Sequence, residues 1–465
     1  MRKVRRCPNF LVARAHLHFK ADDLRATHQA ERRSLCCRRL HATCTSLLAR
    51  RHSQHSGNRM LNERASRLRL RFHALALCLS IPALVGAQVD ANSVRAVRTT
   101  PTEKFAVSSG NRDWGPASIA GNIIVAGGPS GKAGLHAIDM LTGKLKWSYR
   151  PADINASVSS PPAIVRDLAI APFGAANPGA VIAVSMSTGK AVWRGADPAT
   201  NATVVALGDI AYVQTKDGIF LALDAATGKE VWRRTFSKRY FCVSRPVVAD
   251  GVVYVSGGVD AVSGDAARPE GFDMMALDAK TGQEKWRHRA EAEYGTVGVC
   301  VTAPVIAGTT LFGVAEAHLY AIDRATGRDR WKSVETRAMV DGRARLVQVA
   351  GLVNAGAVLV GVTETALVAY DKSSGKTAWE LPGAYSLSSP STAVAGNVLY
   401  FQGSPQSQPA PTSRGTLYAL DLDTRAVLWS FTRPTAEKNW SFGFVTPVND
   451  GLWVDSYKAL VKLQP

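Results

Sequence analysis

Cysteine and histidine are scarce in most of this chain. Beyond residue 87 the sequence has only two cysteines, Cys242 and Cys300, and only three histidines, His136, His288 and His318. Each histidine lies in or beside an expected hairpin strand, so no cluster with metal-ligand spacing is visible. The sequence also has no nucleophile–base motif and no glycine loop of the kind that cradles phosphate. These absences leave the sequence without a motif for a zinc site, a hydrolase or a nucleotide-binding protein.

Excess positive charge is confined to the first part of the chain. The formal net charge is +19, but residues 1–87 contain 18 Lys+Arg against 4 Asp+Glu. The rest of the chain contains 38 against 33. The bulk of the protein is therefore nearly balanced in charge, and no nucleic-acid partner is indicated.

Residues 1–59 differ in composition from everything that follows. They are rich in Arg, His and Cys and contain no Trp. One interpretation is a basic, disordered extension. We favour another, in which the reading frame begins too far upstream and synthesis starts at Met60.

Residues 60–87 have the pattern of a secretory signal peptide. A positive region with four arginines precedes the apolar run Ala74–Val85, and small residues follow at the expected cleavage site. The run is too short to span a bilayer. Cys78 follows the bulky Leu77, which does not favour a lipid anchor. The sequence predicts a periplasmic protein with no transmembrane segment in the mature chain.

An eleven-residue phrase recurs seven times after the signal peptide. Its clearest copy reads ALDAKTGQEKW, and successive copies end on tryptophans 39 to 54 residues apart. A repeat of this period, made of short strands, is typical of propellers and solenoids. The copies are Ala137–Trp147, Ala183–Trp193, Ala222–Trp232, Ala276–Trp286, Ala321–Trp331, Ala369–Trp379 and Ala419–Trp429.

Each copy is predicted to form a tight hairpin. The Asp can accept hydrogen bonds from turn amides, the Gly can adopt a left-handed conformation, and the Trp can pack against the next unit. Two copies depart from the pattern, with Ser185 in place of Asp and Arg425 in place of Gly. The residues assigned this structural role are Asp139, Gly143, Trp147, Gly189, Trp193, Asp224, Gly228, Trp232, Asp278, Gly282, Trp286, Asp323, Gly327, Trp331, Asp371, Gly375, Trp379, Asp421 and Trp429.

The sequence predicts an all-β, eight-bladed propeller over residues 103–465, with four antiparallel strands per blade. The last unit supplies three strands, and the strand that begins at Glu103 has no blade of its own. We expect that N-terminal strand to complete the last blade and close the ring, which removes exposed sheet edges. Seven blades is the alternative. Residues 88–102 are expected to be a flexible lead-in.

The phrase Ala-hydrophobic-Asp-x-x-Thr-Gly-x-x-x-Trp resembles the tryptophan-docking repeat of pyrroloquinoline quinone (PQQ)-like propellers. The resemblance covers about residues 104–463 and implies the fold rather than a cofactor. One branch of these propellers is the quinoprotein dehydrogenases. The other is non-enzymatic periplasmic propellers, typified by the propeller component of the outer-membrane β-barrel assembly machinery.

The dehydrogenase branch implies an adjacent-cysteine disulfide, a calcium ion and often a Cys-x-x-Cys-His haem site. The only adjacent cysteines are Cys36 and Cys37, outside the expected mature chain, and no Cys-x-x-Cys-His occurs. The resemblance therefore favours a non-catalytic scaffold, without a cofactor, that binds envelope or outer-membrane proteins as a monomer within a larger assembly. A small dehydrogenase using PQQ and calcium is the alternative, and a carbohydrate- or peptide-binding module also stays open.

Function is expected on the face opposite the Thr-Gly turns, where the blade-to-blade linkers carry Arg and aromatic residues of the kind enriched in interfaces. The alternative is that the aromatic residues plug the axial channel and the charges are only solvated. The candidate interaction face comprises Arg239, Tyr240, Phe241, Tyr294, Arg337, Arg343, Arg345, Tyr385, Trp440 and Phe442.

Cys242 and Cys300 occupy matching places on consecutive blades. Each lies four residues before a proline, Pro246 or Pro304, that begins a blade. An oxidising periplasm would permit a disulfide between them. The alternative is two small buried thiols whose Cα atoms are too far apart to bridge.

Overall fold

The computed structural model describes most of the chain from residue 94 onward. The described residues are 94–108, 115, 117–128, 134–153, 157–158, 160–174, 179–195, 202–215, 218–235, 240–260, 269–291, 303–315, 318–333, 337–340, 343–346, 349–363, 365–384, 392–405, 416–433, 442–456 and 459–465. The proposed signal peptide and the segment before it lie outside these ranges.

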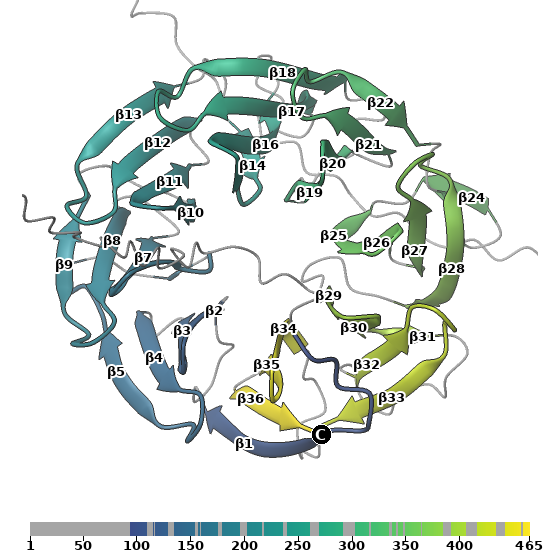
Figure 1. Ribbon diagram of the computed structural model, residues 1–465, viewed down its shortest axis with the longest axis horizontal. Coiled ribbons are helices and arrows are strands. Elements are labelled where there is room, and N and C mark those ends of the chain that lie inside the picture. Colours follow the sequence, from purple (N-terminus) through teal and green to yellow (C-terminus); the bar gives the residue numbers. More distant parts are fainter. Residues whose placement is uncertain are drawn as a thin grey trace, which may run out of the picture. The chain divides into compact units, whose positions relative to one another are not determined.

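Eight antiparallel sheets follow one another around a ring, as Figure 1 shows. Blades 1 to 4 comprise β2 (Ala117–Ala120), β3 (Ile123–Gly127), β4 (Leu135–Asp139) and β5 (Leu145–Tyr149); β6 (Ala163–Val165), β7 (Leu168–Phe173), β8 (Ala180–Ser185) and β9 (Ala191–Arg194); β10 (Thr203–Leu207), β11 (Ile210–Gln214), β12 (Ile219–Asp224) and β13 (Glu230–Thr235); and β14 (Tyr240–Val243), β15 (Val247–Ala249), β16 (Val252–Asp260), β17 (Pro269–Asp278) and β18 (Glu284–Glu291).

The remaining blades continue the same order. Blades 5 to 8 comprise β19 (Val305–Ala307), β20 (Thr310–Ala315), β21 (His318–Asp323) and β22 (Asp329–Lys332); β25 (Ala350–Ala355), β26 (Val358–Val362), β27 (Ala366–Asp371) and β28 (Thr377–Ala384), joined by β31 (Ser404–Pro405); β29 (Thr392–Ala395), β30 (Val398–Gln402), β32 (Thr416–Asp421) and β33 (Val427–Thr432); and β34 (Phe442–Val448), β35 (Gly451–Ser456), β36 (Ala459–Gln464) and β1 (Thr102–Ser108). A separate hairpin, β23 (Arg337–Val340) and β24 (Arg343–Leu346), lies between blades 5 and 6 in the chain.

The predicted ring closure is confirmed. β1 pairs antiparallel with β36, with Thr102 opposite Gln464, and completes the last blade. The prediction of eight blades is correct and the seven-blade alternative is wrong, because the N-terminal strand supplies the strand that the C-terminal unit lacks.

The repeated hairpin is held by its Asp. In blade 1 one carboxylate oxygen of Asp139 accepts hydrogen bonds from the amides of Leu141 and Thr142 (3.1 and 2.9 Å) and from the Thr142 hydroxyl (2.9 Å). Gly143 has φ 68° and donates its amide hydrogen to the Asp139 carbonyl. The turn therefore needs this Asp and a residue that tolerates positive φ.

In blade 2, Ser185 stands in place of the Asp, and Asp167 supplies the carboxylate instead. The Ser185 hydroxyl accepts the Thr188 amide at 3.1 Å and donates to Asp167, which lies in the turn between β7 and its preceding strand. Asp167 also accepts the Ser187 amide at 2.9 Å. The turn thus keeps an acidic acceptor despite the substitution.

Each motif Trp docks on the next blade. Six of them donate the indole N–H to a backbone carbonyl there, and several rings lie directly over the motif Gly, where an added Cβ would meet the ring at 2.5–2.7 Å. Only Gly leaves room for that ring. The donor–acceptor pairs are Trp147–Met186, Trp193–Ala225, Trp232–Ala279, Trp286–Arg324, Trp331–Lys372 and Trp429–Val97.

The hydrophobic core is divided among the joints between blades. Buried side chains form eight clusters, and each cluster joins two neighbouring blades. Alternate residues of the middle strands serve the joints on either side, because side chains of a strand point to opposite faces in turn. The ring is therefore stabilised joint by joint.

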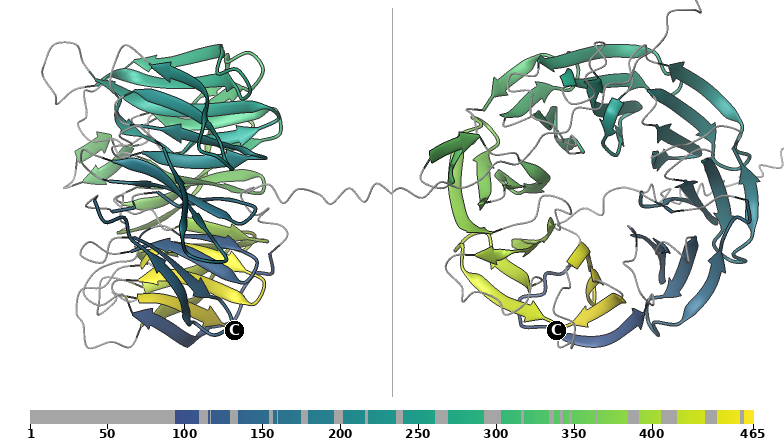
Figure 2. Two further views of the ribbon diagram at one scale, coloured as in Figure 1. Left: turned by 90° about the vertical axis from the view of Figure 1, so that its left-hand side faces the viewer. Right: turned by 180° about the vertical axis from the view of Figure 1, so that it is seen from behind.

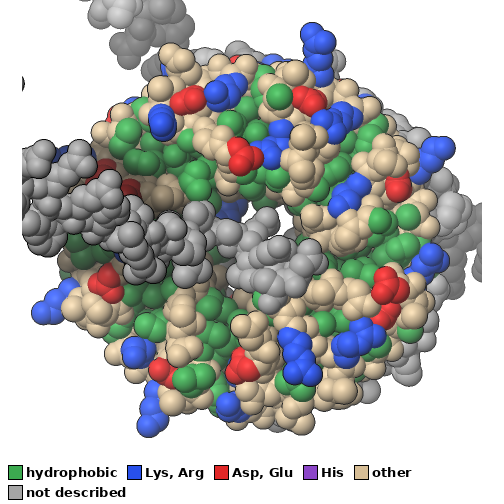
Figure 3. Space-filling model, in the orientation of Figure 1, with side chains coloured by type: hydrophobic (Ala, Val, Ile, Leu, Met, Phe, Trp, Pro, Cys, Tyr) green, Lys and Arg blue, Asp and Glu red, His purple; other side chains and the backbone are tan. Residues whose placement is uncertain are grey.

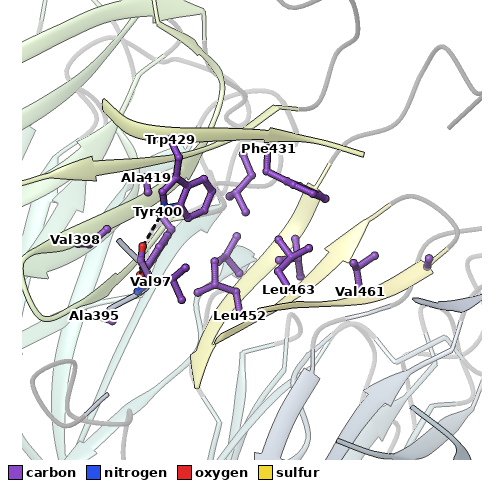
Figure 4. Close-up of a cluster of buried hydrophobic side chains, with 14 residues drawn as sticks. Val97, Ala395, Val398, Tyr400, Ala419, Trp429, Phe431, Leu452, Val461 and Leu463 are labelled. Carbon is purple, nitrogen blue, oxygen red and sulfur yellow. Dashed lines mark hydrogen bonds between the residues drawn. The ribbon is translucent and has the colours of Figure 1, made fainter. Parts of the chain in front are cut away.

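The two joints of blade 8 each use a substitute for part of the motif. Blade 8 has no continuous hairpin, so the carbonyl of Val97 accepts the Trp429 indole N–H at 3.0 Å, and Val97 is only 2% exposed (Figure 4). Phe105 on β1 covers Gly143, the place that a Trp occupies in other joints. Val97 belongs to the segment expected to be a flexible lead-in, and its side chain is buried between blades 7 and 8.

Candidate functional site

The ring has two dissimilar ends. We call the end with the Asp-x-x-Thr-Gly turns the turn end. The opposite end, where strands two and three and successive blades connect, is the loop end. The ring is shorter along its axis than across, as the side view of Figure 2 shows. On the turn end, drawn in Figure 3, acidic and basic side chains are dispersed around the ring with hydrophobic ones between them.

The structure places several residues of the candidate interaction face on strands at the loop end. Tyr240 and Phe241 lie on β14, Arg337 on β23, Arg343 and Arg345 on β24, and Phe442 at the start of β34. The three arginines share one two-stranded hairpin, with Ala338 opposite Arg345 and Val340 opposite Arg343. Arg239, Tyr294, Tyr385 and Trp440 lie outside the described residues.

The structure describes only one of the two cysteines of the possible disulfide. Cys242 lies on β14 and pairs with Gly258 of β16. Cys300 falls outside the described residues, so the disulfide stays a prediction.

Blade 4 extends further than its neighbours toward the loop end. β16, β17 and β18 contain 9, 10 and 8 residues, whereas the strands of blade 3 contain 5 or 6. The extra length of β16 pairs with β14 through Val259, Gly258 and Gly257. The extension therefore carries β14, and with it Tyr240 and Phe241.

A buried carboxylate supports this extension. Asp273 on β17 is 1% exposed and accepts hydrogen bonds from Arg287 Nη1 at 3.0 Å and Arg289 Nε at 2.9 Å. Both arginines are on β18, and Arg289 lies directly opposite Asp273. A buried acid held by two guanidinium groups ties β17 to β18 beyond the length of an ordinary blade.

At the inner strands of blades 3 and 4, polar side chains form a connected cluster. The hydroxyls of Ser244 and Ser256 are 2.6 Å apart. The Ser256 carbonyl accepts the side-chain amide of Gln214 at 3.3 Å, and the Ser244 carbonyl accepts the Thr203 hydroxyl at 3.2 Å. We call Thr203, Gln214, Ser244, Arg245 and Ser256 the inner polar cluster.

Arg245 is the charged member of this cluster. It precedes Pro246 and β15, the innermost strand of blade 4, and its Nε donates to the Val204 carbonyl of blade 3 at 3.3 Å. Its two terminal nitrogens have no hydrogen-bond or carboxylate partner among the described residues. Burial lowers the pKa of the guanidinium below its ordinary value. Among the described residues, the Val204 carbonyl is therefore the one group that this guanidinium contacts by a hydrogen bond.

Sequence reasoning missed Arg245, although a signal for it exists. Inner strands end at a turn with a positive-φ residue, which is Asp250 in blade 4. Arg245 lies five residues before this turn residue. The same position in blades 2, 3, 5 and 6 has a small or apolar residue or Thr, namely Pro161, Thr203, Ala303 and Gly351. A blade-by-blade alignment would have shown Arg245 as the exception.

Metal ligands do not gather in the described part of the chain. No group of three or more His, Cys, Asp or Glu side chains there could hold a metal ion. The same described residues contain no helix of sufficient length and hydropathy to cross a bilayer.

A protein-family model described as outer membrane protein assembly factor BamB matches residues 87–333 and 177–431. The two matches together span most of the chain. The chain belongs to the BamB family. The expectation of a PQQ-like repeat related to outer-membrane assembly propellers is thereby confirmed. A search of curated protein sequences gave no match.

Solved structures share the fold at low sequence identity. BamB from Moraxella catarrhalis has a TM-score of 0.57 at 16% identity, covering 79% of this chain and 100% of that one. The computationally designed Ika8 protein has a TM-score of 0.57 at 14% identity, covering 78% and 99%. A quinohemoprotein alcohol dehydrogenase from Pseudomonas putida HK5 has a TM-score of 0.55 at 13% identity, covering 79% and 78%. The BamB-like propeller fold is therefore shared with enzymes.

Proposed function

We propose that this protein is an exported, non-catalytic propeller that binds other envelope proteins through its loop end. Membership of the BamB family is the observation that carries this proposal. The structural match spans the whole length of the M. catarrhalis BamB chain. Residues 60–87 would direct export to the periplasm, and sequencing the N-terminus of the secreted protein tests that step.

The contrast between the two ends supports the loop end as the binding surface. At the turn end most of the motif Asp, Thr and Gly groups bond within their own turn, and in blades 2 to 6 the Trp of the preceding blade covers the Gly. At the loop end blade 4 is extended, and an arginine-bearing hairpin stands outside the eight blades. Arginine and aromatic residues concentrate binding energy in interfaces.

A matched pair of triple variants tests this assignment. One variant changes Arg337, Arg343 and Arg345 to Ala. The control changes Lys144, Lys190 and Lys229 to Ala, which removes the same charge from exposed positions at the turn end. Tagged proteins are cross-linked to their neighbours in intact envelopes, and the captured proteins are identified by mass spectrometry.

We expect the arginine variant to lose specific envelope partners and the lysine variant to keep them. Equal capture by both variants and the unchanged protein would place binding elsewhere. The absence of any specific partner for the unchanged protein would contradict the scaffold function itself.

The second candidate is a PQQ-dependent dehydrogenase, because enzymes of that fold match the chain structurally. We propose that no quinone is needed. A thermal-shift measurement with PQQ and calcium separates the two functions, since binding to the folded state raises the unfolding temperature. An upward shift accompanied by dye-linked alcohol oxidation would favour the enzyme.

A further inference from the structure

We propose that the repeated hairpins of blades 1 to 3 form a surface that binds to an anionic phospholipid bilayer. The inference goes beyond the proposed function, because it concerns the turn end rather than the loop end. It rests on the exposed apolar side chains of these hairpins, on their unpaired lysines and on the contrast with blades 4 and 5. We call the residues that carry it the rim patch: Leu141, Lys144, Leu145, Lys190, Val192 and Val231.

Exposed apolar side chains gather on these three hairpins. Five large hydrophobic side chains of the described chain are exposed, and four of them belong to the rim patch. Leu141 and Leu145 are 55% and 54% exposed, and Val192 and Val231 are 53% and 48% exposed. A single exposed hydrophobic residue is ordinary on a protein surface, whereas several close together mark a contact surface. The rim patch is therefore a candidate for contact with another surface.

The three hairpins also contact one another. Trp147 of blade 1 lies over Gly189 of blade 2, immediately before Lys190. Trp193 of blade 2 lies in the same way over Gly228 of blade 3. Their outer strands β5, β9 and β13 follow one another along the outside of the ring in Figure 1. Because the hairpin tips are all at the turn end, one flat surface can contact all three hairpins together.

The lysines of the rim patch have no carboxylate partner within the described chain. Lys144 and Lys190 follow the motif Gly, are exposed, and form no ion pair with a described residue. Glu230, which precedes Val231, is paired with Arg233 at 2.6 Å and does not cancel their charge. A lysine can lay its aliphatic stem on apolar surface and keep its ammonium group in water. Apolar side chains with unpaired positive charge are complementary to an anionic lipid surface.

The hairpins of blades 4 and 5 are built differently at the same place. The two residues before the motif Trp are charged there, and each has an ionic partner. The pairs are Glu284–Arg287, Lys285–Asp278, Asp329–His288 and Arg330–Asp323, at 2.7–3.2 Å. In blades 1 to 3 an apolar residue takes one of these two positions, namely Leu145, Val192 or Val231. The motif turn forms in both groups of blades, so the fold does not require the rim patch.

Binding to vesicles tests the proposal. The purified protein is mixed with vesicles of phosphatidylglycerol and phosphatidylethanolamine, or with neutral vesicles of phosphatidylcholine, and bound protein is measured by flotation. The charge variant carries Lys144→Gln and Lys190→Gln. Its matched control carries Arg328→Gln and Lys376→Gln, which removes two charges from the same motif position of blades 5 and 6, across the ring.

We expect the unchanged chain to bind the anionic vesicles and not the neutral ones. The charge variant should bind at least about tenfold more weakly, because each lysine near an anionic surface strengthens binding about fivefold. The control should bind within about twofold of the unchanged chain, because salt screens charges on the far side of the ring. Leu141→Ser combined with Leu145→Ser should also weaken binding about tenfold, since apolar contact adds to the electrostatic attraction.

The replaced side chains are all exposed, so every variant should unfold at the temperature of the unchanged chain. If the leucine variant unfolds at a lower temperature, the charge variant and its control decide the question. Equal losses in those two would indicate attraction by net charge alone and would overturn the proposal. A lack of binding between the unchanged chain and anionic vesicles would overturn it as well.

A second copy of the chain is the other occupant that the experiment can detect. A dimer in sedimentation velocity that the leucine variant abolishes would make the rim patch an interface between two copies and would contradict the proposal. Vesicle binding uses purified components, so it does not depend on a protein partner. If it fails while envelope cross-linking still captures partners, the scaffold function stands and only this inference fails.

Discussion

The two ends of the ring differ in how their polar side chains are hydrogen-bonded. At the turn end the motif Asp and Thr bond inside their own hairpin in blades 1, 3, 4 and 5, and a Trp covers the motif Gly in blades 2 to 6. At the loop end of blades 3 and 4 the Arg245 guanidinium keeps two terminal nitrogens without a described partner. The repeated motif builds the ring, whereas the positions that do not repeat are not needed for it.

The largest effect is expected from Gly375→Ala, which breaks the turn end at one joint. Gly375 has φ 70°, and an added Cβ would lie 2.5 Å from the Trp331 ring. The free energy of unfolding should fall by about 3 kcal/mol from strain and displacement of the ring. In the control Gly356→Ala, φ is 65° but nothing lies within 4 Å, so the loss should be about 1 kcal/mol. Urea unfolding measures both, and equal losses would show that the Trp contact is unimportant.

Phe105→Ala tests whether Phe105 stabilises the joint between blades 8 and 1 as the motif Trp does in the other joints. The Phe105 ring covers Gly143 and lies 5.5 Å from the Trp453 ring between centroids. Its loss should cost about 2–3 kcal/mol, again by urea unfolding. Phe105→Trp restores the side chain used by the other joints and should retain most of the stability. A larger loss for Trp than for Ala would mean that the closing joint has its own geometry.

Acid should weaken the turn end selectively. Bonds from Arg330 and Thr326 lower the pKa of Asp323 to about 2, and bonds from the Thr424 amide and Arg98 lower that of Asp421 to about 2. Because these folded values lie below the ordinary 3.8, the stabilisation is complete above that pH and is lost as pH falls toward 2. The unfolding temperature should therefore drop over that window. The double variant of Asp323→Asn and Asp421→Asn should show a shallower drop, and an unchanged slope would contradict the assignment.

The smallest effect is expected from Arg425→Gly, which makes blade 7 like the others. Arg425 has φ 62° at the motif Gly position. Replacement by Gly removes the left-handed penalty and should raise the free energy of unfolding by up to about 1 kcal/mol. Arg425→Ala keeps the backbone penalty and serves as the control. A gain of the same size in both would point to the Arg side chain rather than the backbone.

The fold could be predicted because its determinants are local and repeated. Asp, Gly and Trp recur at fixed spacing, and each acts within its hairpin or on the adjacent blade. The unpaired strand after Glu103 further indicated how the ring closes. Val97 could not be found in this way, because its role depends on Tyr400 and Trp429, about three hundred residues away.

The role of the candidate interaction face stays a prediction. Arg337, Arg343 and Arg345 were assigned to a linker at the loop end, and they share one hairpin there. The extension of blade 4 and the buried Asp273 were missed, because strand length and the pairing of an acid with two arginines are tertiary properties. Arg245 was missed, although a blade-by-blade alignment of the inner strands distinguishes it.

The pairing of β1 with β36 also determines which blade can form last during folding. Thr102 lies opposite Gln464, so the first strand of the ring has no partner until the last one has been synthesised. Blades 1 to 7 can assemble one after another from neighbouring segments, whereas the eighth must wait for both ends of the chain. Until then β1 and the apolar joints on either side of blade 8 stay open to other polypeptides. An incomplete chain would therefore be most vulnerable at these two joints.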